Sequence, residues 1–460
     1  MKSFKACLQD VGGLQFIYEN LSLQSPMGRR GLLNQTFITH ADLLQKELDL
    51  LEKSVHFLQK ESNYFTIKSV NQALRQCNDI STTIFRLEQK QVLDDVELFE
   101  IKKFCLLSQQ IENLLQNAEF QAVSIADTEL IISILDPERT RIPHFYIYSA
   151  YDAQLESLRK KLSAESNPEK AREYLLESIK QEDLIRENLA EQLFPFHKIL
   201  KQNIEQIAIL DILWSKAEQA LKFGFCKPFI SNEITIYKQL FNPAVKEILQ
   251  KSSKEFQAID IELYKDSCLI TGANMSGKTV LLKTIALSQY LFQFGFYVPA
   301  ISADIMPVNE VFINTGDHQS ETNGLSSFAD EILKVNQIIK KVKNEEKLLV
   351  LIDELARTTN PEEGKALVSA FIQIMKTYKV MSVISTHYSG ILLPTRKLRV
   401  KGLKIDRITE DITSKNLNNY MDYSLIETQS ADVPMEALKI AEVFNVDEEF
   451  LQLAKEMMRE

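Results

Sequence analysis

The first half of the chain has the hydrophobic pattern of long amphipathic helices. Apolar residues at 44–58 recur at steps of three and four, which places them on one helical face. The same spacing runs through residues 200–221 over about six turns, and residues 93–118 are a third strong helix candidate. The run 144–150 is the one short β-like stretch in this half. Because no glycine occurs between Gly31 and Gly224, few tight turns are expected, which also favours long helices.

After residue 224 the pattern changes to short apolar runs separated by glycine turns and helical segments. Residues 267–271, 347–353 and 380–387 are near-continuous apolar runs, as expected of buried parallel strands. Each run is followed by a helical segment, which is typical of an α/β domain. The sequence therefore predicts an α + α/β protein, with an all-helical domain over residues 1–240 and an α/β domain over residues 241–460.

A phosphate-binding motif follows the first of these predicted strands. Residues 272–279, Gly-Ala-Asn-Met-Ser-Gly-Lys-Thr, match the P-loop pattern and stand between a strand and a helix. The glycines let successive backbone N–H groups face a phosphate at the positive end of the helix. We expect Lys278 to reach the β- and γ-phosphates and the Thr279 hydroxyl to bind Mg²⁺. An accidental glycine turn is a much weaker explanation of a match in this context.

Two adjacent carboxylates, Asp353 and Glu354, end the second predicted strand. Carboxylates at the end of a buried strand are costly unless they have a cationic partner, and Mg²⁺ would supply one. We expect Asp353 to contribute to the metal site and Glu354 to polarise the attacking water. His387 ends the next apolar run. A single His after a strand is often structural, but one strand beyond an Asp-Glu pair the position favours a γ-phosphate sensor.

The segment 271–300 resembles the MutS family of mismatch-repair ATPases, in the Asn-Met of its P-loop and in Tyr-Val-Pro-Ala at its end. Further matches follow in the family's order: Gly-Leu-Ser-Ser-Phe at 324–328 with Glu331, the run 348–364, and Thr-His-Tyr at 386–388. Upstream, Phe-Asn-Pro-Ala at 241–244 resembles the entry to the ATPase domain, and residues 19–51 resemble the start of the helical core domain.

The resemblance implies a P-loop ATPase of the ABC class that works as a head-to-tail homodimer with ATP and Mg²⁺. It implies that Ser326 contacts the γ-phosphate in the partner subunit, that Phe256 stacks on adenine, and that the helical half is a core and lever domain. Residues 433–458 resemble the family's helical dimerisation tail. The implied nucleotide-binding set consists of Gly272, Asn274, Met275, Ser276, Gly277, Lys278, Thr279, Val280, Phe256 and Ser326, with Glu354, His387 and Lys278 as catalytic residues and Thr279 and Asp353 at the metal.

Several departures from the family pattern concern the grip on DNA. The first 240 residues contain no Phe-x-Glu mismatch wedge, and only residues 162–186, which look helical and mixed in charge, are available for the clamp. This indicates a shortened member of the family. Small residues replace the usual ones in the P-loop, where Ala273 stands for proline and Ser276 for glycine, and Ala356 stands where glycine is common. We expect these changes to be mild.

Amino-acid composition narrows the class of protein and its cellular location. Hydrophobic residues make up 45% of the chain and charged ones 25%, which excludes disordered and membrane-embedded classes. The net charge of −10 weakly disfavours bulk wrapping of DNA, although a local basic groove is compatible with it. Five scattered cysteines indicate a reducing compartment, and no apolar run is long enough to span a membrane, so we expect a cytoplasmic protein without a membrane partner.

Three functions are compatible with these features. The first is a DNA-processing ATPase that recognises branched or distorted DNA through basic groups such as Arg29-Arg30 and Lys340-Lys341-Lys343, although each of these runs taken singly is more often solvated surface. The second is an ATPase that remodels a protein client, as MutS-like proteins do in reactivating a cobalamin-dependent lysine aminomutase. The third is a generic ABC engine, which is disfavoured because no Leu-Ser-Gly-Gly-Gln segment occurs. DNA is the leading partner, with a protein client close behind.

Overall fold

A computed structural model describes residues 2–272, 276–315, 327–344, 346–357, 359–404, 420–429, 437–444 and 446–458. The chain forms two compact units. The first, called here the helical unit, comprises residues 21–35 and 50–218, and the second, the sheet unit, comprises the rest. The boundaries fall inside α4 (Ala41–Gln59) and α11 (His197–Phe223), so each of these helices contributes residues to both units.

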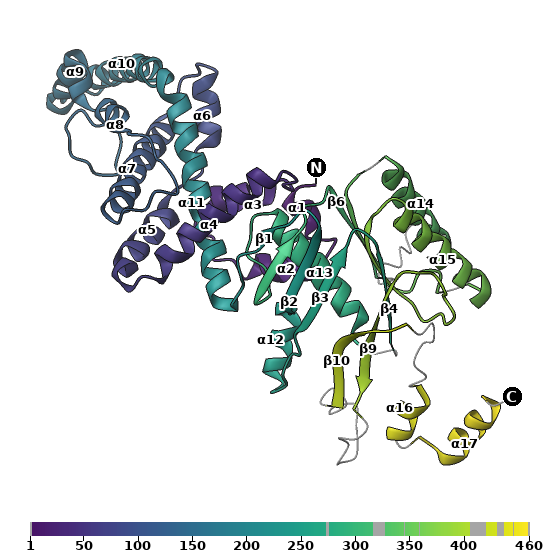
Figure 1. Ribbon diagram of the computed structural model, residues 1–460. Coiled ribbons are helices and arrows are strands. Elements are labelled where there is room, and N and C mark those ends of the chain that lie inside the picture. The colour runs from purple at the N-terminus through teal and green to yellow at the C-terminus, as the bar shows by residue number, and fades with distance from the viewer. Residues whose placement is uncertain are drawn as a thin grey trace. The chain divides into compact units, whose positions relative to one another are not determined.

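The helical unit consists of helices that share one apolar core (Figure 1). Besides its parts of α4 and α11 it contains α3 (Pro26–Asn34), α5 (Tyr64–Gln76), α6 (Ser81–Glu88), α7 (Asp95–Asn117), α8 (Glu129–Leu135), α9 (Ala153–Ala164), α10 (Pro168–Leu193) and the 3₁₀ turns at 61–63, 149–151 and 194–196. Aromatic rings form part of the core: Trp214 lies 5.7 Å from Phe57 and 5.8 Å from Phe120, centroid to centroid. The helices predicted at 44–58, 93–118 and 200–221 are confirmed as α4, α7 and α11.

The strand-like run at 144–150 is not a strand. It is a loop held by a buried lysine on α7: Lys102 Nζ donates to Asp136 Oδ1 at 3.1 Å, to the carbonyl oxygen of His144 at 2.9 Å and to the Tyr148 hydroxyl at 3.0 Å. Lys102 and Asp136 are 0% and 1% exposed. The apolar residues that alternate along 144–150 therefore pack into the helical core. The predicted strand would have needed a neighbouring strand to pair with, and among the residues that the structure describes none lies beside this loop.

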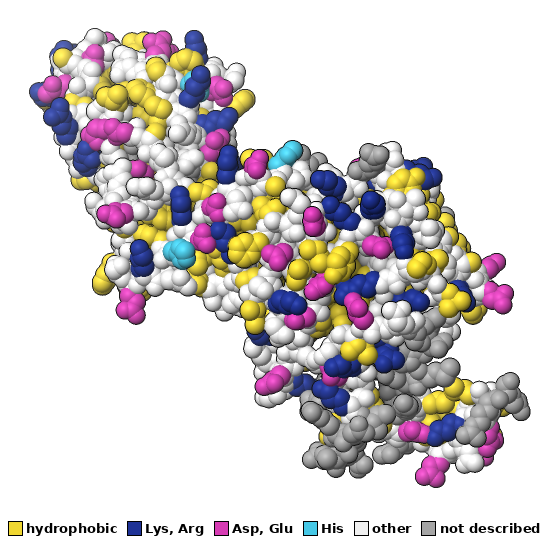
Figure 2. Space-filling view, in the orientation of Figure 1, with side chains coloured by type: hydrophobic (Ala, Val, Ile, Leu, Met, Phe, Trp, Pro, Cys, Tyr) yellow, Lys and Arg dark blue, Asp and Glu magenta, His cyan; other side chains and the backbone are white. Residues whose placement is uncertain are grey.

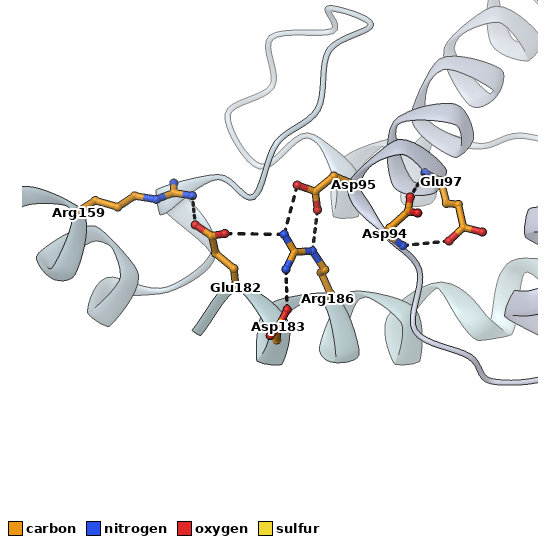
Figure 3. Close-up of polar contacts among 7 residues, drawn as sticks. All are labelled: Asp94, Asp95, Glu97, Arg159, Glu182, Asp183 and Arg186. Carbon is orange, nitrogen blue, oxygen red and sulfur yellow. Dashed lines mark hydrogen bonds and ion pairs between the residues drawn. The ribbon is translucent and has the colours of Figure 1, made fainter. Parts of the chain in front are cut away.

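The segment proposed as a reduced clamp is helical, as predicted, and lies mainly in α10, which runs beside α9 (Figure 1). Three of its charged residues, Glu182, Asp183 and Arg186, form ion pairs within the unit. Arg186 binds Asp95 at the start of α7, with Nε 2.7 Å from Oδ1, and Glu182 accepts from Arg159 of α9 at 2.8 Å (Figure 3). These pairs link α10 to α7 and α9.

The sheet unit contains two mixed sheets. The six-stranded sheet has the order β10-β9-β4-β8-β7-β6, and the four-stranded sheet has the order β1-β5-β2-β3. The strands are β1 (Phe229–Ile230), β2 (Ile234–Leu240), β3 (Ile259–Tyr264), β4 (Ser267–Thr271), β5 (Ser302–Ile305), β6 (Glu310–Asn314), β7 (Leu348–Ile352), β8 (Met381–Ser385), β9 (Arg396–Leu403) and β10 (Met421–Glu427). The predicted apolar strands are confirmed as β4, β7 and β8, and all their residues are buried.

Helices pack against the six-stranded sheet. From residue 241 onward the described helices of the sheet unit are α12 (Pro243–Lys251), α13 (Lys278–Gln293), α14 (Ser327–Lys343), α15 (Pro361–Thr377), α16 (Ala437–Val443) and α17 (Glu448–Met457). α14 and α15 share a core with the side chains of Leu348, Val350 and Ile352, which alternate along β7, and α13 packs against β6 and β7. The chain is therefore mixed helix and sheet, as predicted.

The sheet unit also includes residues that the sequence analysis assigned to the helical half. β1 and β2 lie before residue 241, and α1 (Phe4–Cys7) and α2 (Gly12–Glu19) also belong to this unit. The reason is aromatic packing: the Phe4 ring lies 5.0 Å from that of Phe294 and 6.0 Å from that of Phe296, just beyond α13. No helix among the described residues is long and apolar enough to cross a bilayer.

Candidate functional site

The P-loop follows β4 and leads into α13. Residues 273–275, which include the predicted Asn274 and Met275, lie outside the described residues. A Cβ built on Gly272 would lie 2.9 Å from Ser276 Oγ, and Gly277 has a φ of +82°, which a residue with a side chain rarely adopts. Ser276 Oγ is buried without a hydrogen-bond partner in the described part of the chain. The turn is thus tight enough to require both glycines, and it presents a buried hydroxyl that a bound phosphate oxygen would satisfy.

Lys278 is the first residue of α13 and is 6% exposed. Its Nζ donates to the carbonyl oxygen of Gly272 at 2.8 Å, so the side chain folds back along the loop that precedes it. A buried ammonium group is costly unless carbonyl groups and negative charges surround it. This position, next to the N-terminal N–H groups of a helix, therefore favours an anion.

The carboxylate of Asp353 is held on both sides. It follows β7, and its Oδ2 accepts from the Thr279 hydroxyl while its Oδ1 accepts from the Ser385 hydroxyl. These contacts are possible because β8 lies between β4 and β7, so the carboxyl ends of the three parallel strands meet at one edge of the sheet. The two predicted metal-site residues, Thr279 and Asp353, are thereby brought together.

Glu354 has a left-handed backbone, with a φ of +53°. Its N–H donates to Ser385 Oγ at 3.0 Å and to the Ser385 carbonyl oxygen at 3.2 Å, which fixes the turn after β7. Its side chain is 17% exposed, and Oε2 lies 3.4 Å from Nε of the mostly exposed Arg357. Glu354 is therefore a partly accessible carboxylate at the same edge as Lys278 and Asp353, where the sequence predicts the base.

The turn after β7, which contains Ala356, is held by Tyr388 and Glu331, and the sequence did not indicate these roles. The Tyr388 hydroxyl donates to the Ala356 carbonyl oxygen at 2.6 Å, and the Ala356 N–H lies 3.2 Å from both oxygens of Glu331. Burial raises the pKa of Glu331, and the Ala356 N–H opposes this rise. Ala356 has a φ of +62°, which costs a non-glycine residue about 1–2 kcal/mol. This explains why glycine is common there. The predicted sensor His387 is exposed, and its ring lies 4.2 Å from the Tyr388 ring.

A cavity of about 250 Å³ opens beside the P-loop. It is lined mainly by apolar side chains, together with the backbone of Gly277: Leu240, Val245, Leu249, Lys254, Glu255, Phe256, Gln257, Ile259, Gly277, Val280, Leu281, Thr284 and Tyr423. The set includes Phe256 and Val280, which the resemblance assigned to the nucleotide. A mainly apolar pocket with a few polar groups is typical of a small-molecule site.

Sequence reasoning missed the contribution of β10 to this cavity. Tyr423 lines it, and a Cβ on Gly277 would lie 3.1 Å from the Tyr423 ring. The neighbouring Asp422 accepts from Gln257 at 2.9 Å and from Ser424 at 2.6 Å. Burial alone would raise the pKa of Asp422, but these hydrogen bonds and the nearby Lys404 lower it well below its usual range. The ionised carboxylate thus ties the loop carrying Phe256 and Gln257 to β10.

Within the described ranges, no group of three or more His, Cys, Asp or Glu side chains lies close enough to hold a metal ion. The Thr279 and Asp353 pair nevertheless suits Mg²⁺, which takes one or two protein oxygens together with waters and phosphate oxygens. Ser326, the residue predicted to act on the partner subunit, lies outside the described residues.

The basic runs proposed for DNA are partly neutralised. Arg30 Nη1 lies 2.5 Å from Asp79 Oδ2, and Lys341 forms an ion pair with Glu310. Figure 2 shows Lys and Arg interspersed with Asp and Glu on the face that it draws. These runs are therefore weak evidence for a DNA surface.

Comparison with known proteins finds similarity for the part of the chain that carries the P-loop. A family profile described as MutS domain V matches residues 268–460. Endonuclease MutS2 of Ligilactobacillus salivarius is 33% identical over 208 residues, which is 44% of this chain and 25% of that protein. Endonuclease MutS2 of Carboxydothermus hydrogenoformans is 35% identical over 196 residues, 42% of this chain and 24% of that protein.

The human DNA mismatch repair protein Msh3 is 27% identical over 290 residues, 62% of this chain and 25% of that protein. The chain thus spans about a quarter of the length of each of these relatives. The part of the chain that carries the P-loop and the Asp-Glu pair is thus similar to domain V of the MutS family and to the corresponding quarter of these relatives.

Proposed function

We propose that this chain binds ATP with Mg²⁺ at the carboxyl edge of the six-stranded sheet and hydrolyses it. The observation that carries the proposal is the hydrogen bond from Thr279 to Asp353, because it joins the residue after the P-loop lysine to a carboxylate 74 positions further along the chain. Two motifs that were each predicted to serve a nucleotide are thereby in direct contact.

Each residue of the site has a proposed role in binding or hydrolysing ATP. The P-loop backbone and Lys278 would hold the phosphates, and the cavity that contains Phe256 and Tyr423 would hold the base. Thr279 and Asp353 would hold Mg²⁺, which neutralises phosphate charge when bound. Glu354 would orient a water molecule and accept its proton, and His387 would contact the terminal phosphate.

We further propose that the ATPase cycle is coupled to gripping DNA in a head-to-tail homodimer. The relatives, an endonuclease and a DNA mismatch repair protein, support DNA over a protein client. The 460 residues contain no Phe-x-Glu sequence, so branched or distorted DNA is a better candidate than a single mismatch. In the dimer, Ser326 of each subunit would complete the site of the other.

Nucleotide binding and phosphate release test the first proposal. Lys278→Ala should abolish binding of a fluorescent ATP analogue and the release of phosphate, because it removes the cation from the loop. Lys265→Ala is the matched control, since Lys265 is exposed and precedes the opposite end of β4. Equal turnover in the two variants would refute the phosphate site.

DNA binding is tested by its salt dependence. A grip through several phosphates should weaken on the order of a thousandfold between 50 and 200 mM salt. If no DNA form binds at 50 mM salt and none changes the ATPase rate, DNA is not the partner, and a protein client takes its place.

A further inference from the structure

A groove of about 410 Å³ lies on α5 of the helical unit. It is lined by residues spaced along one side of this helix: Tyr64, Ile67, Lys68, Asn71, Gln72 and Arg75. Tyr64, Lys68, Asn71 and Arg75 follow one another at steps of four, three and four, so they form a single stripe about 17 Å long. The opposite side of α5 packs into the core through its buried residues Val70, Ala73 and Leu74.

Two large aromatic side chains stand at one end of this stripe. Tyr64 is 60% exposed and Phe65 is 77% exposed, and their rings are 5.5 Å apart at an angle of 78°. Neither ring belongs to the core, because only the other side of α5 is buried. Adjacent aromatic rings left in water offer flat faces on which another ring system can stack.

The residues that line the groove include two cations, Lys68 and Arg75, and no carboxylate. Residues 62–78 contain Lys68 and Arg75 and no Asp or Glu, in a chain with a net charge of −10. Arg75 Nε donates to the neutral side-chain oxygen of Gln24 at 2.6 Å. The carboxylate of Glu218, which is half-buried, accepts hydrogen bonds from Ser22 and Asn71 and lies near Arg75. The groove thus combines the exposed ring of Tyr64, two cations and two side-chain amides, with the exposed ring of Phe65 beside it.

We propose that this groove binds single-stranded nucleic acid, such as the unpaired bases of a branched DNA. Bases would stack on Tyr64 and Phe65, Lys68 and Arg75 would lie against the phosphates, and the amides of Asn71 and Gln72 would bond to base edges. A duplex offers phosphates but no free base faces, so it would leave the two rings unused. The inference rests on the proposed DNA-linked function and adds the form of nucleic acid and the surface that binds it.

Fluorescence anisotropy of a labelled dT20 oligonucleotide with the full chain, without ATP, tests this inference. Tyr64→Ala/Phe65→Ala should weaken binding about tenfold or more, because the stacking of bases on the two rings is lost. Lys68→Ala/Arg75→Ala should reduce the slope of log affinity against log salt by about 1.4, from two phosphate contacts on a single strand. The controls are Phe85→Ala and Lys180→Ala, which remove an exposed aromatic ring from α6 and an exposed charge from α10. Circular dichroism confirms that each variant is folded.

The outcomes separate the alternatives. Selective loss of dT20 binding in the groove variants, with affinity for a 20-base-pair duplex retained, supports the inference. The inference is overturned if dT20 does not bind at 20 mM salt, which would leave a protein segment as the occupant of the groove. It is also overturned if Tyr64→Ala/Phe65→Ala and Phe85→Ala bind dT20 equally well. Since the assay contains no nucleotide, loss of ATP hydrolysis in Lys278→Ala leaves its result unchanged, so the ATPase proposal and this one can fail separately.

Discussion

Ser385 is the residue whose removal should test most sharply how the Asp-Glu pair is positioned. It ends β8 and is 0% exposed. Its hydroxyl donates to Asp353 Oδ1 and accepts the Glu354 N–H at 3.0 Å. In Ser385→Ala the Glu354 N–H keeps its bond to the carbonyl oxygen of residue 385. The loss therefore falls mainly on the carboxylate of Asp353.

The expected magnitude follows from the kind of bond that is lost. A hydrogen bond to a charged group contributes about 1.5–3 kcal/mol, which corresponds to about 10- to 150-fold in a rate or binding constant. We expect Ser385→Ala to lower kcat within this range and to raise the Mg²⁺ concentration needed for half-maximal activity. Initial rates of phosphate release over a Mg²⁺ series at fixed ATP measure both effects.

Ser382→Ala is the control for this prediction. Ser382 lies on the same strand and is 1% exposed, but its hydroxyl bonds to that of Ser267 at 2.7 Å, at the end of β8 away from Asp353. It therefore reports the cost of deleting a buried hydroxyl from β8 without touching the site. If the two variants show the same rates and the same Mg²⁺ dependence, Ser385 does not orient Asp353 in the working site.

Three further predictions concern the proposed ATPase site and the helical unit. Glu354→Gln should retain nucleotide but slow hydrolysis about 10²-fold or more, and single-turnover phosphate release at the wild-type rate would exclude Glu354 as the base. Ser326→Arg mixed with wild-type chain should lower the activity of both subunits, whereas strictly additive activity would contradict composite sites. Lys102→Ala should destabilise the helical unit by about 3–5 kcal/mol, because Asp136 is left buried without its cation, while the neighbouring Lys103→Ala should have little effect on the apparent Tm. Burial would raise the pKa of Asp136, but hydrogen bonds from the Arg141 N–H, Lys102 and Thr140 lower it, so the stabilisation is present at neutral pH and is lost as pH falls through that pKa. The deficit of Lys102→Ala should therefore shrink in acid, and a pH-independent deficit would argue against the ion pair.

The parts of the fold that could be predicted from the sequence are those determined by local pattern. The apolar strands β4, β7 and β8 and the helices α4, α7 and α11 have strong periodicity, and the P-loop is a continuous segment. The order of the strands in the sheet does not follow from local pattern, because β8 comes after β4 and β7 along the chain and yet lies between them. For this reason Asp353 was predicted as a metal residue, while its partner Ser385 was not.

Two other features depend on contacts between distant segments. The alternation at 144–150 is that of a strand, but Lys102 holds this segment in the helical core as a loop. Tyr423 lines the cavity beside the P-loop because β9 and β10 pair antiparallel and because Asp422 bonds to Gln257. Each of these positions becomes interpretable only when the partner segment is known.

The geometry at Asp353 explains why residues from separate elements are needed at one edge of the sheet. A lone carboxylate at a strand end can rotate, and ordering it on ligand binding would cost side-chain entropy. Here Thr279 on α13 and Ser385 on β8 bond to opposite oxygens of the carboxylate, so its orientation is fixed by two neighbouring elements. The turn that follows is held in the same way, with Tyr388 on the Ala356 carbonyl and Glu331 on the Ala356 N–H. A site ordered in advance loses little freedom when it binds charge, which is the condition under which fixed dipoles and carboxylates stabilise a transition state most effectively.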